Sequence, residues 1–597
     1  MHADSKIFSE ILSTSGNQYV IPFFQRGFVW EEPSWEGLFN DMLGAINSKK
    51  HLFIGAIVLK KINEKQQSVI DGQQRLTTLC LIASALSFVV PSERDYFKML
   101  FTHLNYNDED SSENCLNNHI LIQSHQSEAD FIKVMNLTVD EDFSKIENPS
   151  NVRKAFEFFK NKFIAMKNSN ETIPTLAKFI QCVQLVKIDL SENENEQKIF
   201  DTINSLGIRL TTADLLKNFL YTNKEIDFFY KTWGAEFEKD EDCLKYWNSD
   251  IKLGRLTDKN IDNFLYYYLQ IVYFRDKKRL GYKYEQPEEK NIRKKSMQFS
   301  NYKNYIEHFK INKNDFINDL IKYADKYREL IKALIDDMPR ESGFERLNYI
   351  ITSLDCTTVI PYILYISQEN DDESDLNNMY KYIEIYLMRR MLSGAQNNNY
   401  SDLFTENLIG SEINTYEKLK DYIENQKNEE DALSMPSDKK IESFVKTNQF
   451  RNDKALPILY LIESTTRSQK SCTQLHKLSN YSLEHLMPKK WERNWPLPLQ
   501  EDTPEKRKEL TEKRNSLINT LGNMGIISQT LNTSISNAAW SNKLNGTKKS
   551  EGLKKCAAGI EIMADVLATE KWNEQTIQDR TEKLYQYIIK LWPIISE

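Results

Sequence analysis

The sequence predicts a mostly helical α+β protein that is built from several domains. The chain has 597 residues, which is too long for a single hydrophobic core. Strand and helix patterns alternate over residues 1–225, which indicates an α/β domain. Long helical patterns with few glycines fill residues 226–425. A polar segment at 426–440 is the predicted linker, and residues 441–597 form a C-terminal domain.

The composition excludes several classes of protein. The net charge is −8, so the chain as a whole is not a basic coat for nucleic acid. The seven cysteines are scattered and contain no CxxC pair, which indicates neither a disulfide framework nor a zinc knuckle. No run of about 18 apolar residues could span a membrane, and the N-terminus has no signal-peptide pattern. We therefore expect a cytoplasmic protein without a membrane partner.

The first domain opens with a helix pattern at residues 6–12 and a strand at 19–21 that enters an aromatic loop. This loop carries Phe24, Gln25 and Arg26, and a polar pair among aromatic side chains requires a polar partner. The patterns that follow predict, in order, a helix at 35–46, a strand at 53–59, a loop at 105–130, a helix at 152–166 and a strand at 183–190.

A polar run, Asp-Gly-Gln-Gln-Arg at residues 71–75, lies where a predicted strand passes into a predicted helix. The strand covers 67–70, and apolar residues recur at helical spacing from Gln73. The free N–H groups and the dipole of the helix make an anion site. Arg75 can bind a phosphate through two N–H groups, and Asp71 could hold a metal ion or a water. From these residues alone, a capped helix with a surface arginine remains the alternative.

Residues 196–220 predict two helices joined by a tight turn. The first helix ends at Gly207, and the second begins at Thr211 or Thr212, which can cap it. The turn carries more polar residues than a simple helix pair in a bundle requires.

These segments together resemble the three motifs of a known family, the DGQQR-containing domain of the GmrS type. The motifs lie at residues 21–26, 71–75 and 200–220, and the likeness covers about the first 225 residues. It implies a fold similar to ParB and sulfiredoxin, binding and hydrolysis of GTP or ATP, and sensing of modified DNA. Phe24 stands where the family usually has tyrosine, and we expect its loop to contact the DNA. The implied nucleotide-site residues are Gln25, Arg26, Asp71, Gly72, Gln73, Gln74 and Arg75, of which Asp71 and Arg75 are also expected to be catalytic.

The C-terminal domain carries a second polar constellation. Glu484 and His485 lie in a predicted strand, a Gly-Asn pair ends at Asn523, and Asn532 and Lys543 lie in a predicted helical segment. A metal-dependent nuclease needs a neutral histidine that takes a proton from water. It also needs hard oxygen ligands for a divalent ion at the scissile phosphate.

This constellation resembles the HNH, or His-Me finger, nuclease domain of the GmrD type, whose fold is ββα-metal. The resemblance implies that His485 is the general base and that Asn523 fixes its backbone or ring. Glu484 and Asn532 would bind Mg²⁺ or Mn²⁺, and Lys543 would contact phosphate.

Together the two resemblances imply a modification-dependent DNA endonuclease of antiviral defence, of the GmrSD and SspE kind. Its partner would be double-stranded DNA with sugar-decorated hydroxymethylcytosine or a phosphorothioate backbone, and a homodimer is left open. An NTP-regulated DNA-binding protein, whose nuclease-like domain binds without cutting, is the alternative. A helical scaffold would leave both polar constellations unexplained.

Overall fold

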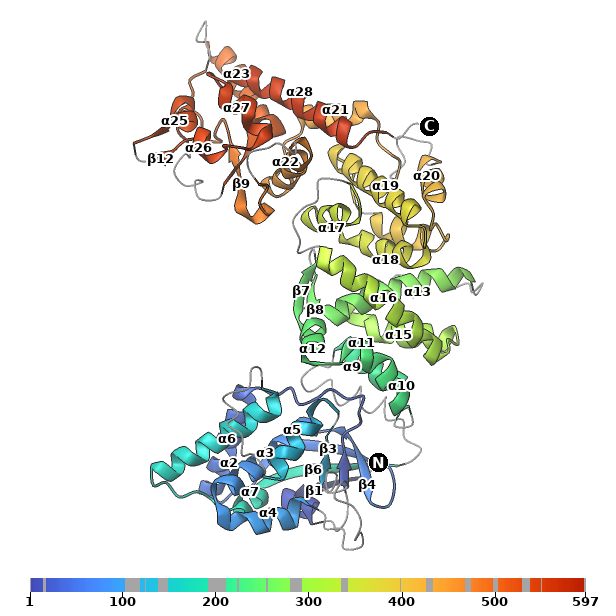
Figure 1. Cartoon of the computed structure of the whole chain (residues 1–597). Helices are drawn as coiled ribbons and strands as arrows, with labels where there is room; N and C mark the ends of the chain where they lie inside the picture. Colours follow the sequence, from blue (N-terminus) through green and yellow to red (C-terminus); the bar gives the residue numbers. More distant parts are fainter. Residues whose placement is uncertain are drawn as a thin grey trace. The chain divides into compact units, whose positions relative to one another are not determined.

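The protein is an α+β protein in which helices predominate, as the sequence predicts (Figure 1). Its packing divides the chain into two compact units, Met1–Lys239 and Asp240–Glu597. The computed structural model describes residues 2–13, 18–102, 119–123, 125–137, 149–191, 211–222, 225–253, 256–279, 292–333, 342–397, 399–425, 433–467, 474–497, 503–528, 537–548 and 550–594.

The first unit is built on a six-stranded mixed sheet with the order β1-β6-β3-β4-β2-β5. The strands are β1 (His2–Ile7), β2 (Gln18–Val20), β3 (Leu52–Lys61), β4 (Gln66–Asp71), β5 (Leu121–Ile122) and β6 (Val183–Leu190). β1 with β6 and β3 with β4 are antiparallel, whereas the other neighbouring pairs are parallel. Parallel pairs need crossover connections, which the helices of this unit supply.

The helices of the first unit are α1 (Phe8–Leu12), α2 (Glu32–Ser48), α3 (Gln73–Val89), α4 (Arg94–Phe101), α5 (His125–Met135), α6 (Asn151–Asn168), α7 (Leu176–Cys182), α9 (Thr212–Leu220), α10 (Ile226–Lys231) and α11 (Trp233–Phe237). α3 is the central helix, because every residue from 76 to 87 is buried. Figure 1 shows α2, α3 and α6 packed beside the sheet, where they form its main core. A smaller cluster of Val58, Ile70 and Leu190 packs against Leu215 of α9.

Most predicted elements of the first unit are confirmed. The passage from β4 to α3 lies where it was expected, and Thr211 caps α9 by accepting from the backbone N–H of Asp214 at 3.1 Å. The helix predicted at 6–12 begins only at Phe8, because the residues before it pair with β6 as an edge strand. The loop predicted at 105–130 contains the start of α5 in its described part.

The helical region of the second unit comprises α12 (Glu241–Asn248), α13 (Asn260–Arg279), α15 (Gln298–His308), α16 (Lys313–Ala333), α17 (Phe344–Ser353), α18 (Ile360–Glu369), α19 (Glu373–Leu392) and α20 (Tyr416–Glu424), with the hairpin β7 (Asp250–Leu253) and β8 (Leu256–Lys259). The region confirms the prediction of long helices between residues 226 and 425. α10 and α11, which fall in the same stretch of sequence, pack within the first unit.

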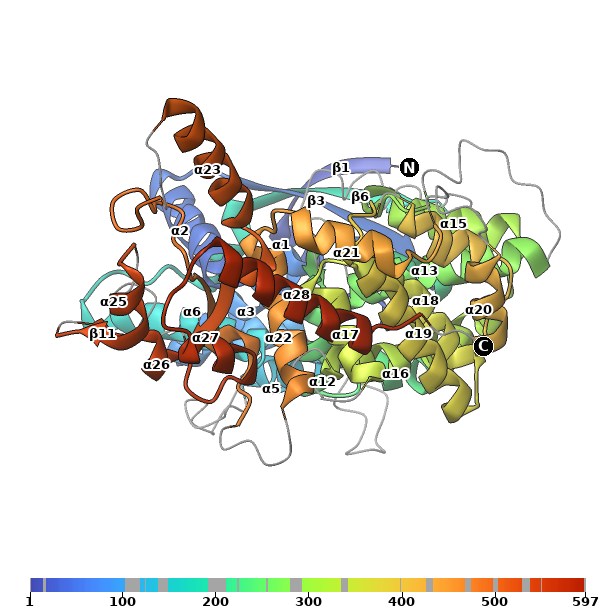
Figure 2. The same cartoon turned by 90° about the horizontal axis from the view of Figure 1, so that it is seen from above.

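The last region of the second unit carries two antiparallel strands, β9 (Tyr481–His485) and β10 (Met524–Ser528). Its other elements are α21 (Asp438–Thr447), α22 (Asn452–Thr466), α23 (Pro504–Leu517), α25 (Trp540–Asn545), β11 (Gly546–Thr547), β12 (Ser550–Glu551), α26 (Leu553–Cys556), α27 (Ala564–Ala568) and α28 (Glu574–Leu591). α28 packs against α21 and crosses α22 (Figure 2). The strand predicted around Glu484 and His485 is confirmed as β9.

The end of the second unit is fastened to its helical region through α19. Arg389 of α19 is fully buried and donates to the carbonyl oxygens of Pro436, at 2.7 Å from Nη2, and of Trp592, at 2.7 Å from Nη1. Trp592 is itself buried, and its indole donates to Glu384 of α19 at 2.9 Å. The described part of the predicted linker, 426–440, is therefore held against α19.

Candidate functional site

The strand-to-helix corner of the first unit depends on a glycine. Gly72 separates β4 from α3 and has a φ of +99°, a conformation that glycine adopts at little cost. A Cβ at this position would lie 2.6 Å from Cγ2 of Ile57 on β3. The N-cap residue, Gly72, has no side chain that could cap α3, and the first N–H groups of a helix can bond to an external acceptor such as an anion.

Two of the predicted nucleotide-site residues, Gln25 and Gln74, tie the aromatic loop to this corner. Gln25 donates to the carbonyl oxygen of Val69 at 3.0 Å. Gln74 accepts from the backbone N–H of Val29 at 2.9 Å and donates to the carbonyl oxygen of Gly27 at 3.0 Å. Because both side chains are buried and bonded within the protein, they position the loop.

Arg75 and Asp71 form an ion pair at the same corner. Arg75 Nη2 lies 2.8 Å from Asp71 Oδ2, and the two side chains are 22% and 19% exposed, so the pair borders solvent. Arg75 lies over Gly55 of β3, where a Cβ would come within 2.4 Å of Nη1. Gly55 falls at a register shift between β3 and β6. Gly55 was not among the predicted site residues, although an isolated glycine in an apolar strand is a signal for such a close approach.

Among the described residues of the motif segments, three polar atoms are buried without a hydrogen-bond partner: Arg26 Nε, Gln73 Oε1 and Asn218 Oδ1. Asn218 follows Lys217 on α9, and Lys217 donates to Glu238 at 2.6 Å. Burial lowers the pKa of Lys217, but its carboxylate neighbours, Glu238 first, outweigh burial and raise it, while the charge of Arg26 acts against them. α9 therefore lies beside the aromatic loop, and three segments of the sequence contribute to one corner.

Phe24, which was expected to contact DNA, is largely enclosed. Its exposed fraction is 9%, and its ring packs edge-on against Phe23 at a centroid distance of 5.2 Å. Phe23 in turn packs on Phe229 of α10 at 5.0 Å. The loop is thus anchored by its aromatic residues, and the DNA contact of Phe24 stays a prediction.

The second candidate site lies at the end of β9, which carries Glu484 and His485. His485 Nε2 lies 3.1 Å from Oδ1 of Asn519, and the amide nitrogen of Asn519 donates to Gln449 at 3.4 Å. The amide oxygen therefore faces the ring, so Nε2 carries the proton and Nδ1 keeps its lone pair. Asn519 was missed by the sequence analysis, because no spacing distinguishes it from its polar neighbours.

The surroundings keep His485 neutral. Burial, and then the positive charges of Lys489 and Lys543, lower the pKa of His485 to about 4, against the opposing effect of its hydrogen bond to Asn519. A neutral imidazole near pH 7 can accept a proton, as a general base must.

Asn523 fixes the chain just beyond His485. Its side chain is fully buried and bonds both backbone groups of Met487, accepting from N–H at 2.7 Å and donating to the carbonyl oxygen at 2.8 Å. It also accepts from the indole of Trp572 at 3.1 Å. The preceding Gly522 has no room for a Cβ, which would lie 2.3 Å from the carbonyl oxygen of Ile577 on α28. Gly522 and Asn523 thus hold the backbone next to His485, whereas Asn519 holds its ring.

Lys543 is not placed to contact phosphate as predicted. Its side chain is fully buried, and its ammonium group bonds to the carboxylate of Glu484 and to the carbonyl oxygen of His485. Burial lowers the pKa of Lys543, and Glu484 opposes this shift.

The described residues at this place offer oxygen donors of the kind that bind a divalent ion, but not a complete set of ligands. Asn532, one predicted ligand, lies outside the described residues, and within the described part of the chain no three His, Cys, Asp or Glu side chains cluster to hold a metal. The carboxylate of Glu484 and the carbonyl of His485 are nevertheless hard oxygens that already converge on a positive charge. Binding of Mg²⁺ or Mn²⁺ by Glu484 stays a prediction.

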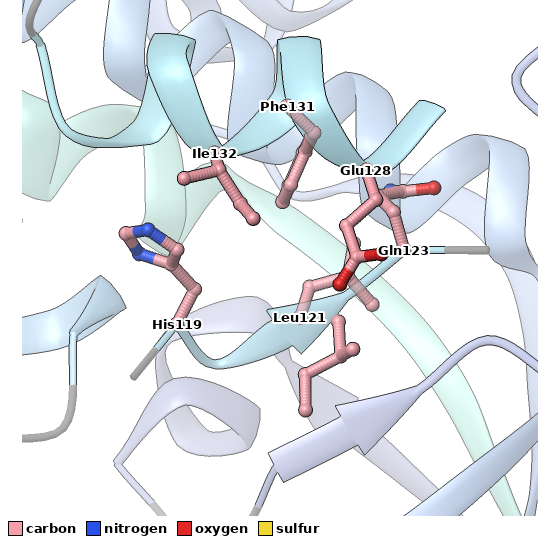
Figure 3. Close-up of a pocket in the computed structure, with 7 residues that line it drawn as sticks. His119, Leu121, Gln123, Glu128, Phe131 and Ile132 are labelled. Carbon is pink, nitrogen blue, oxygen red and sulfur yellow. The ribbon is translucent and has the colours of Figure 1, made fainter. Parts of the chain in front are cut away.

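Figure 3 shows a small pocket in the first unit with His119 on one side and Gln123 and Glu128 on the other. Its volume of about 10 Å³ is enough for one water molecule at most. Burial lowers the pKa of His119, so the ring stays neutral in this apolar setting. Gln123 donates to Thr77 of α3 at 2.7 Å. The pocket lies between the β5 segment and α5, and it is too small for a ligand.

Comparison with known families gives two matches. Residues 7–221 match the model of the GmrSD restriction endonuclease N-terminal domain, and residues 435–587 match that of the GmrSD restriction endonuclease C-terminal domain. No curated protein matches the chain. Among the described residues, no helix has both the length and the apolar character to cross a membrane. The expected likeness to ParB, sulfiredoxin and ββα-metal nucleases stays a prediction.

Proposed function

The chain belongs to the GmrSD restriction endonucleases, and we propose that it couples nucleotide hydrolysis in its first unit to metal-dependent DNA cleavage in its second. The observation that carries the nuclease assignment is the neutral His485, fixed by Asn519 next to Glu484. The defence role follows from the restriction endonuclease family.

In the proposed cleavage step, His485 is the general base. Its Nδ1 takes a proton from the attacking water, while the hydrogen bond between Nε2 and Asn519 keeps the ring in the required tautomer. Asn523 keeps the backbone beside the histidine in place. A bound Mg²⁺ or Mn²⁺, held by Glu484 and Asn532, would stabilise the charge that develops on the phosphate.

We place the nucleotide site at the corner of the first unit. The uncapped start of α3 and the side chains of Arg26 and Arg75 would bind the phosphates of GTP or ATP. The unpartnered atoms Arg26 Nε and Gln73 Oε1 support this proposal, because a buried polar atom without a partner is unfavourable until a ligand supplies one. Asp71 holds Arg75 through their ion pair, and its carboxylate would orient the attacking water in the proposed hydrolysis.

The nuclease is tested with His485→Ala in the full chain. Cleavage is measured on plasmids of plain DNA, of sugar-decorated DNA and of phosphorothioate DNA. We expect strand cleavage to fall by about 10² to 10⁴-fold while phosphate release from the nucleotide continues, because the base acts only on the DNA. His476→Ala is a matched control, since this exposed histidine lies in the same region and should leave cleavage intact.

Cleavage at the wild-type rate by His485→Ala would reject the HNH assignment. Tight DNA binding by the wild type without cleavage, in every combination of nucleotide and metal, would favour the alternative of a binding protein. Equal cleavage of modified and plain DNA would reject the dependence on modification.

A further inference from the structure

Lys543 is in an unusual place for a lysine of an enzyme that acts on anionic DNA. Its side chain is fully buried and has no surface to offer a phosphate. Its Nζ contacts two oxygen atoms, one in the carboxylate of Glu484 and one in the carbonyl of His485. Glu484 is itself 7% exposed, and a buried carboxylate needs a compensating charge, which Lys543 provides.

Tryptophans hold the short helix α25 that carries Lys543. Trp540, in the turn before Lys543, stacks on Trp572 with a centroid distance of 5.2 Å. Trp495 donates to the carbonyl oxygen of Ala538, just before the helix, at 3.0 Å. The backbone of α25 therefore holds the Lys543 ammonium group against Glu484.

Two cations repel each other when they share one buried carboxylate. Glu484 is the carboxylate that the proposed function gives to the divalent metal, and the inference rests on that function. We propose that Lys543 is the resident counter-cation of Glu484 and that Mg²⁺ or Mn²⁺ competes with it. The lysine therefore keeps the affinity for metal low in the absence of DNA. When DNA is bound, its phosphates add negative charge next to Glu484. This charge allows the Lys543 ammonium group and the divalent metal to be held together, so the metal binds to the nuclease site with the substrate.

The test measures binding of Mn²⁺ to the full-length protein, without nucleotide or DNA, from the electron paramagnetic resonance signal of free Mn²⁺. Lys543→Met removes the charge and keeps an unbranched side chain, so we expect the Kd for Mn²⁺ to fall by about tenfold or more, which is about 1.4 kcal/mol or more of binding free energy. Lys489→Met is the matched control, because Lys489 is an exposed lysine whose charge also acts on His485. It should not tighten binding.

Unchanged or weaker Mn²⁺ binding by Lys543→Met would overturn the proposal. Glu484→Gln separates this failure from failure of the proposed function. Wild-type binding by Glu484→Gln would show that Glu484 is no ligand and would overturn both. Loss of binding by Glu484→Gln without a gain in Lys543→Met would overturn only the competition.

A thermal measurement covers the case in which Lys543→Met is poorly folded. Without Lys543, the buried carboxylate of Glu484 has no counter-charge, so Mn²⁺ should raise the Tm of Lys543→Met more than that of the wild type. Equal shifts in Tm, or a smaller one in the variant, would contradict the proposal.

Discussion

The two candidate sites differ in whether their buried polar groups are hydrogen-bonded within the protein. At the corner of the first unit, Arg26 and Gln73 each have a buried atom with no hydrogen-bond partner in the part of the chain that the structure describes, and the ion pair of Asp71 and Arg75 borders solvent. A buried polar group without a partner costs about 1–3 kcal/mol, which a ligand can recover by bonding to it. A bound ligand would therefore supply hydrogen-bond partners to the buried polar atoms of the first site.

At the end of β9 the protein satisfies the key polar groups by itself. Asn523 bonds to Met487, Ile518 and Trp572. Arg580 of α28 is buried and donates to the carbonyl oxygens of Gly522, at 2.9 Å, and Met524, at 2.6 Å. Changes at the first site should therefore alter binding more than folding, whereas changes around the second should alter folding first.

Arg75→Ala should give the clearest sign that a change at the first site alters binding more than folding. We expect phosphate release from the nucleotide to fall by about 10² to 10³-fold, because a cation aimed at the phosphates is lost. The Tm should change little, since a solvent-bordering ion pair contributes at most about 1 kcal/mol. Arg94→Ala, at an exposed arginine of α4, is the control. Normal hydrolysis by folded Arg75→Ala would move the nucleotide site elsewhere.

Asn523→Ala should show the second behaviour. The change strands the backbone groups of Met487 and the indole of Trp572 in the core, so we expect the free energy of unfolding to fall by about 2–3 kcal/mol. Chemical denaturation followed by tryptophan fluorescence measures it. Asn537→Ala is the control, because this exposed side chain lies in the same region. A variant of wild-type stability that has lost cleavage would show that Asn523 takes part in the chemistry.

The pH dependence of cleavage should give the smallest effect near neutrality. The pKa of His485 is about 4 in the fold and 6.5 when unperturbed, so the neutral base is present at pH 7 and is half lost only near pH 4. Because the unfolded chain binds the proton first, the stabilising contribution of neutral His485 is full above pH 6.5 and is lost as the pH falls toward 4. Cleavage rates and denaturation midpoints measured across this range check both. A rate midpoint near 6.5 would mean that the ring is solvated.

Short-range sequence patterns were enough to predict parts of the first site. The β-branched residues before Asp71, the turn at Gly72 and the helical spacing after Gln73 placed the first corner correctly. The capping hydroxyl of Thr211 likewise needed only its own neighbours in sequence.

Features that depend on distant partners could not be predicted. β1 is a strand because it pairs with β6, which lies far along the chain. The environment of Lys543 depends on Glu484, which lies on another element, and Asn519 is distinguished only by the imidazole of His485 that it contacts. Sequence spacing identified the type of residue, and long-range packing decided whether it faces a ligand or the protein.

The hydrogen bond from Arg389 to the carbonyl of Trp592 limits where this chain can be joined to a related protein in a chimaera. The C-terminal family match covers residues 435–587, so Trp592 lies beyond it and Glu384 and Arg389 lie before it. A graft limited to the matched residues would leave Arg389 without the carbonyl of Trp592, and Glu384 without its indole. A chimaera with a related enzyme should therefore carry α19 together with everything that follows it, since hydrogen bonds join α19 to the C-terminal end.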